Sequence, residues 1–160
     1  MTQIRVFDPA RYTDEQLKFY GVRLNDIDKD VNAILLENNI QYTAVYTGYG
    51  EDNGWKYDNW MVSFNGQSFE YHTGIGHRTK NKFGTEYAVM PSAASVLYCL
   101  MSDANLATDT FEDFCSDLGY DTDSRKALDC YLKCQENGTK LHKAIKADVW
   151  QRLETALENY

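Results

Sequence analysis

The sequence has little of what would mark a membrane-spanning, secreted or modular protein. Only two of its 160 residues are prolines, Pro9 and Pro91, and no segment rich in proline, glycine and serine forms a linker. The longest apolar run, Val96 to Met101, is far shorter than the roughly 20 residues that span a bilayer. Arg5 and Asp8 interrupt the N-terminus before an apolar run develops, so no signal peptide is expected. A single cytosolic domain covering residues 1–160 is therefore the simplest organisation.

Cysteines are few, and their spacing does not form a metal-binding pattern. The four are Cys99, Cys115, Cys130 and Cys134. Structural zinc sites use two closely spaced ligand pairs, and only Cys130 and Cys134 form such a pair. In a cytosolic chain these thiols are expected to be reduced and mostly buried. We therefore expect neither a metal nor another cofactor.

Catalytic motifs are also missing. Nothing resembles a nucleophile elbow, and no glycine-rich stretch has the full pattern of a phosphate loop or a dinucleotide fingerprint. Folding could still bring Cys115 close to His72 or His77 and form a nucleophile–base pair. The sequence itself gives that pair no support, so stoichiometric binding is expected rather than enzyme activity.

Basic residues are outnumbered by acidic ones. The chain has 16 Lys and Arg against 24 Asp and Glu, which gives a formal net charge of −8. A general nucleic-acid binder is disfavoured, because neutralising phosphates requires Lys and Arg. The negative charge either keeps a small protein soluble or suits a basic partner.

What the chain does have is a composition for a real core, with 43% hydrophobic and 14% aromatic residues. The N-terminal part, residues 13–38, carries two helix signals. Thr13 and Gln16 have capping-box spacing, and the short helix that they begin is expected to stop at Gly21. A second helix is predicted from about Asp26 to Glu37, because its apolar residues recur with helical spacing.

The middle of the chain, residues 40–73, is predicted to form a β-meander. Asn65-Gly66 is the preferred pair for a two-residue hairpin turn. Folding about that turn places Val62 opposite Phe69 and Trp60 opposite Tyr71, so the apolar pairs share one face. Gln41 to Gly48 is expected to supply a third strand.

The C-terminal part, residues 91–160, is predicted to be helical. Helices are expected after Pro91-Ser92, between Asp109-Thr110 and Gly119, from about Asp123 to Glu136, and across Val149–Leu157. Asn137-Gly138 is expected to end the third of these, with Leu128, Tyr131 and Leu132 on its buried face. The predicted class is α+β, with a small antiparallel sheet packed against helices on one face.

The stretch FEYHTGIGHRTKNKFG, Phe69 to Gly84, has no acid after Glu70 in an otherwise acidic chain. One interpretation is a solvated basic loop, and a second is a partner contact through Arg78, Lys80 and Lys82. A third is a site for a small anion or nucleotide, since a glycine-rich strand exit can expose backbone donors. The residues for that site would be His72, Gly74, Gly76, His77 and Arg78.

An acidic run covers residues 102–123, which contain no Lys or Arg. Asp109 and Asp113 suit a helix start, and Asp121 and Asp123 precede the next helix, so capping is the ordinary explanation. The alternative is a surface that imitates nucleic-acid phosphates and occupies a basic groove. The residues predicted to form that surface are Asp109, Glu112, Asp113, Asp117, Asp121 and Asp123.

Two stretches, FEYHTGIGHR and FEDFCSDLGYDTDSRKALDCYLKC, resemble a widespread family of small proteins encoded by bacteriophages and prophages. The resemblance covers roughly the second and third quarters of the chain and part of the last, and it is most specific over Phe111–Cys134. That family has no established chemistry, so the resemblance implies no catalytic residue. It implies a phage accessory gene whose product acts in the bacterial cytoplasm. The N-terminal stretch IRVFDPARYTDEQLKFYGVRL also resembles the opening of the ArdA antirestriction proteins, which are acidic DNA mimics.

The function expected from the sequence is therefore inhibition of a host defence machine, of the anti-CRISPR or antirestriction type, by binding through the acidic surface. The expected partner is a basic, nucleic-acid-binding protein of the bacterial host. Two alternatives remain open: a module that binds a nucleotide-like anion at Gly74–Arg78, and a structural or assembly protein of the phage particle.

Overall fold

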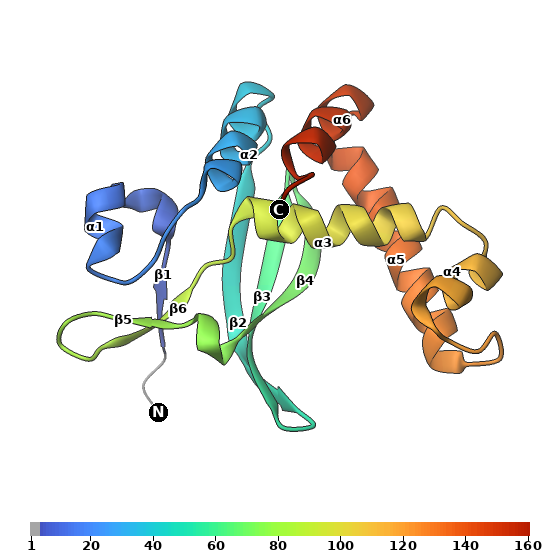
Figure 1. Ribbon diagram of the computed structural model, residues 1–160, viewed down its shortest axis with the longest axis horizontal. Coiled ribbons are helices and arrows are strands. Elements are labelled where there is room, and N and C mark those ends of the chain that lie inside the picture. The colour runs from blue at the N-terminus through green and yellow to red at the C-terminus, as the bar shows by residue number, and fades with distance from the viewer. Residues whose placement is uncertain (1–3) are drawn as a thin grey trace.

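The computed structural model describes residues 4–160 and has an α+β architecture, as predicted (Figure 1). Its strands are β1 (Arg5–Phe7), β2 (Tyr42–Asp52), β3 (Trp55–Phe64), β4 (Gln67–Gly74), β5 (Thr79–Lys80) and β6 (Glu86–Val89). Its helices are α1 (Asp14–Lys18), α2 (Asp26–Glu37), α3 (Ala93–Leu106), α4 (Phe111–Leu118), α5 (Arg125–Ala144) and α6 (Ala147–Ala156). Two short 3-10 turns, Pro9–Arg11 and Ile75–His77, complete the regular structure.

The predicted meander is confirmed as the antiparallel sheet β2-β3-β4. Val62 pairs with Phe69 and Trp60 with Tyr71, in the predicted register. The turn residues Asn65 and Gly66 have φ of 46° and 84°, which is why this pair suits the hairpin. The apolar members of these pairs form one buried face, and the alternate residues are largely exposed.

Both N-terminal helices begin with a capping box. Thr13 and Gln16 exchange the two predicted hydrogen bonds at the start of α1, and Asn25 and Asp28 do the same for α2. These reciprocal bonds satisfy backbone donors that a helix leaves free at its first turn. The predicted bounds of α2 are also confirmed.

A second sheet, with strand order β1-β6-β5, was not predicted from the sequence. Its strands are only two to four residues long. β1 and β6 pair in parallel, although most of the N-terminal half of the chain separates them in sequence. The stretch after Gly74, which was expected to be a loop, instead forms a 3-10 turn and the β5–β6 hairpin. Asn81 shapes the hairpin turn, because its carboxamide oxygen accepts hydrogen bonds from the backbone N–H groups of Phe83 and Thr85.

The prediction that Asn137-Gly138 ends a helix is wrong, because α5 continues through both residues to Ala144. Gly138 faces Ala104 on α3, and a β-carbon built on Gly138 would lie 3.2 Å from the Ala104 β-carbon. The glycine therefore allows two helices to approach closely instead of marking a helix end. No helix within residues 4–160 has the length and apolar character needed to cross a membrane.

The buried face of α5 also differs from the prediction. Tyr131 is buried as expected, but Leu128 and Leu132 are exposed. The buried residues of the helix are Ala127, Tyr131, Cys134, Gly138 and Leu141, and three of these five, Ala127, Cys134 and Gly138, are small. Small residues are consistent with a close approach to α3, and the leucines lie outside that contact.

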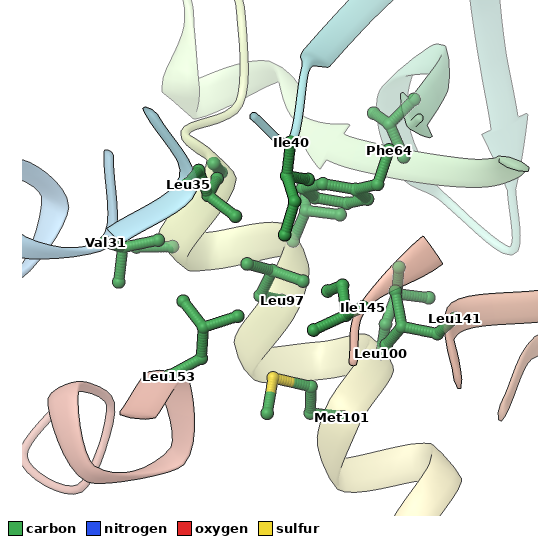
Figure 2. Packing of buried hydrophobic residues seen from close by; sticks show 14 of the residues in the cluster. Val31, Leu35, Ile40, Phe64, Leu97, Leu100, Met101, Leu141, Ile145 and Leu153 are labelled. Carbon is green, nitrogen blue, oxygen red and sulfur yellow. The ribbon is translucent and has the colours of Figure 1, made fainter. Parts of the chain in front are cut away.

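The main core lies between the β2-β3-β4 sheet and a layer of helices. Figure 2 shows Leu97 and Met101 of α3 in this core, together with Leu35 of α2 and Leu153 of α6. Phe64 brings the sheet into the same cluster. A separate small cluster lies between α4 and α5, and a third lies beneath α1.

Candidate interaction surface

The acidic surface consists of Asp109, Glu112, Asp113, Asp117, Asp121 and Asp123, which lie on α4 and the two loops beside it. All six side chains are exposed. Within residues 4–160, none of their carboxylates takes part in an ion pair. The six predicted residues therefore lie on one short segment, and their charges are open to solvent.

The small cluster beneath α4 holds this segment on α5. Phe114 is fully buried there and packs edge-on against Tyr131, with ring centroids 5.1 Å apart. The Tyr131 hydroxyl donates a hydrogen bond of 2.7 Å to the backbone carbonyl of Asp109. Gly119 ends α4 in the left-handed conformation, with φ of 74°. These interactions fix the backbone where each acidic loop joins α4.

Helix capping accounts for less of the acidic run than the sequence suggested. The N-caps of α4 and α5 are Thr110 and Ser124. Their hydroxyls accept hydrogen bonds from the backbone N–H groups of Asp113 and Ala127, respectively. Glu112 and Asp113 lie in the first turn of α4, where they complement the helix dipole. Asp121 and Asp123 lie outside α5 and take no part in its cap. The cap of α5 therefore does not account for these two acids.

Arg78 was predicted to contact a partner, but its guanidinium is held inside the protein. Its Nε and Nη2 donate to the two carboxylate oxygens of Asp58 at 2.9 and 2.7 Å, and its Nη1 donates to Glu86 at 2.6 Å. The Asp58 carboxylate also accepts a bond of 3.1 Å from the Tyr46 hydroxyl. These interactions raise the pKa of Arg78 above its already high ordinary value, with the Asp58 hydrogen bonds as the main cause. Arg78 therefore links β3 to the β5–β6 hairpin and is not free for a partner.

Sequence reasoning did not identify Asp58 as the partner of Arg78, although a signal was present. Asp58 has the same strand parity as Trp60, Val62 and Phe64, so it belongs to the buried face of β3. A carboxylate on a buried face requires a cationic or hydrogen-bonding partner. The identity of that partner depends on the tertiary fold.

The other residues of the basic stretch are divided among different places. Lys80 and Lys82 are exposed on the β5–β6 hairpin. His72 lies on the outer face of β4, where its ring meets Tyr57 edge-on at 4.8 Å. Gly74 and Gly76 do not have positive φ, so the alternating backbone of an anion-binding nest is not formed at this strand exit. The geometry does not favour an anion site built from His72, Gly74, Gly76, His77 and Arg78.

The acidic and basic groups lie at opposite ends of the molecule. Figure 1, with the longest axis horizontal, places α4 at one end and the β5–β6 hairpin at the other. A partner that covers the acidic surface would therefore not automatically reach Lys80 and Lys82. The two groups form separate candidate sites.

The four cysteines divide into two exposed and two buried thiols. Cys99 and Cys130 are exposed, whereas Cys115 and Cys134 are buried. Burial raises the pKa of Cys134 to about 12 and also raises the pKa of Cys115, with Asp121 adding to the second shift. A raised pKa disfavours the thiolate that a nucleophile requires. No group of three or more potential metal-ligating side chains gathers within residues 4–160.

Thiol reactivity is expected to follow this division. Cys99 and Cys130 should react rapidly with an aromatic disulfide reagent at neutral pH, and Cys115 and Cys134 only after unfolding. The measurement is the stoichiometry of thiolate released with and without denaturant. Reaction of all four thiols at one rate in the native protein would contradict the burial of the α4–α5 cluster.

Comparisons of the chain with protein-family models, with curated proteins and with solved structures found no match.

Proposed function

We propose that this protein is a phage or mobile-element accessory factor that binds and inhibits a host defence machine, of the anti-CRISPR or antirestriction type, in the bacterial cytoplasm. The observation that carries the proposal is the acidic surface, with six exposed carboxylates at one end of the molecule. A basic groove built to hold nucleic-acid phosphates is the complementary partner. Inhibition follows because the groove cannot hold its nucleic acid while this protein occupies it.

Two further observations support the proposal. Four of the six carboxylates, those of Asp109, Asp117, Asp121 and Asp123, lie outside the first turn of either neighbouring helix. Like charges that lie close together and are not paired repel one another, so mutual electrostatics does not favour such a group of acids. The resemblance of Phe111–Cys134 to phage-encoded proteins falls on this same segment.

The proposal predicts a salt-sensitive partner in bacterial lysate. Changing Asp113, Asp117, Asp121 and Asp123 together to Asn is expected to reduce capture of the partner about tenfold or more, because charge complementarity governs encounter. Raising the salt concentration should have a similar effect on the unmodified protein, since exposed charges are screened over about 8 Å at physiological ionic strength. Captured proteins are identified by mass spectrometry. The nuclease or DNA-binding activity of each is then measured with and without this protein.

The matched control changes four other exposed acids, Glu15, Asp30, Glu154 and Glu158, to their amides. It removes the same charge from other surfaces and is expected to retain capture. Equal capture by both variants would show that net charge, or another surface, is responsible. A captured protein whose activity is unaffected by a stoichiometric amount of this chain would contradict inhibition.

A further inference from the structure

A pocket of about 370 Å³ lies between α1 and the β5–β6 hairpin, at the end of the molecule opposite the acidic surface (Figure 1). One wall consists of Tyr12, Gln16, Phe19 and Tyr20, and the other consists of Asn81, Lys82 and Phe83. The walls are joined where the Thr79 hydroxyl donates a hydrogen bond to the backbone carbonyl of Tyr20. This volume falls in the range of small-molecule pockets, about 300–1,000 Å³.

Two phenylalanines border this pocket from opposite walls, and both are unusually exposed. Phe19 is 78% exposed and Phe83 is 82% exposed, the highest values among the phenylalanines that the structure describes. Tyr12 and Tyr20 lie behind them and pack on Phe7, with centroid distances of 4.7 and 4.5 Å. The tyrosine side is thus fixed by the cluster beneath α1, whereas the phenylalanine rings face solvent with little internal packing. Exposed aromatic rings on two walls of a pocket can stack on the faces of a planar ligand.

The pocket lining includes a cation and further hydrogen-bond donors. Lys82 is the only charged residue in the lining, and it makes no ion pair within residues 4–160. Its ammonium lies 5.2 Å from the centroid of the Phe83 ring. The Gln16 carboxamide oxygen is used by the capping box, so its NH₂ group is the part that remains for a ligand. An anionic group next to a planar ring would meet Lys82 without a competing carboxylate.

We propose that this pocket binds a planar heteroaromatic ring that carries an anionic group, and that nucleoside monophosphates are the biological ligands of this class. The base would stack between Phe19 and Phe83, and the phosphate would contact Lys82. Base stacking on aromatic side chains tolerates different bases, so the stacking alone does not select one. This site is separate from the Gly74–Arg78 stretch and from the acidic surface, and it goes beyond the proposed function.

Isothermal titration calorimetry with AMP, GMP, CMP and UMP, with adenosine, and with inorganic phosphate tests the site. We expect the monophosphates to bind, adenosine to bind more weakly, and phosphate alone not to bind. Lys82→Gln should weaken the monophosphates about tenfold and leave adenosine unchanged, because only the charged contact is lost. Phe19→Ala and Phe83→Ala should each weaken both kinds of ligand about fivefold or more.

Lys80→Gln is the matched control, since Lys80 is exposed on the same hairpin but does not line the pocket. It should bind like the unmodified protein. Circular dichroism should show that all four variants keep their fold, because the altered side chains are exposed. The proposal is overturned if no nucleotide or nucleoside binds, or if binding survives both phenylalanine changes. It is equally overturned if nucleotides do not bind but Phe19→Ala and Phe83→Ala abolish capture of a protein from lysate, because the pocket then receives a protein side chain.

Discussion

Replacing Arg78 with Ala is expected to destabilise the protein by about 3–5 kcal/mol, the usual cost of removing one partner from a buried ion pair. The Asp58 side chain is 2% exposed and the Arg78 side chain 16% exposed, so water cannot replace the lost guanidinium easily. After the change, the Tyr46 hydroxyl is the one hydrogen-bond partner that the Asp58 carboxylate keeps within residues 4–160. The cost of removing the Asp58 charge from water then remains, but the Arg78 hydrogen bonds that offset it are gone.

The measurement is urea unfolding followed by fluorescence, with Lys80→Ala as the control on the same hairpin. Lys80 is exposed and unpaired within residues 4–160, so its loss should change the free energy of unfolding by about 0.5 kcal/mol or less. Glu86→Gln should cost about 1 kcal/mol, because Glu86 is 40% exposed.

A double variant separates the charge effect from lost packing. Asp58→Leu combined with Arg78→Met removes both charges, and it should be more stable than Arg78→Ala alone. If the double variant is as unstable as the single one, the packing of these side chains matters more than their pairing. An Arg78→Ala protein within 1 kcal/mol of the unmodified chain would show that the pair contributes little.

The parts of the fold that could be predicted are those whose causes are local. The Asn65-Gly66 turn sets positive φ at two adjacent residues, and the alternation on both sides then determines the register of β3 and β4. The cap at Thr13 depends only on residues within one turn. Gly138 shows the limit, because the same residue type ends helices and permits close helix contact. Only the position of Ala104 on another helix decides between the two.

The candidate sites follow the same rule. The acidic run could be located from the sequence because its members are close together along the chain, and the acids of α4 are exposed because the helix packs through Phe114 and Cys115. The role of Arg78 could not be predicted, because Asp58 lies twenty residues away and meets it only through tertiary packing. Phe19 and Phe83 gave no signal at all, since a phenylalanine in a sequence is most often a core residue. Their pairing across a pocket depends on the unpredicted β5–β6 hairpin.

Replacing Phe114 with Ala is expected to remove about 3–5 kcal/mol from the packing that holds the acidic surface in place. Phe114 is fully buried in a small cluster, whose other buried residues within the described part of the chain are Ala107, Tyr131 and Cys134. An eight-residue helix is too short to persist without tertiary contacts. We therefore expect α4 and its loops to unfold locally. Amide hydrogen exchange should become fast in α4 while β3 and the centre of α3 remain protected.

Leu118→Ala is the control, because Leu118 lies on the same helix with a side chain that is 43% exposed, and it should leave the protection of α4 nearly unchanged. The Phe114→Ala protein keeps every charge of the acidic surface but is expected to lose their ordered arrangement. The Asp-to-Asn variant keeps the arrangement and loses four of the charges. If partner capture needs complementarity between charges at fixed positions, both variants should fail. Full capture by Phe114→Ala alongside fast exchange in α4 would mean that the acids act as a disordered polyanion. The folded arrangement of the acidic surface would then be irrelevant to binding.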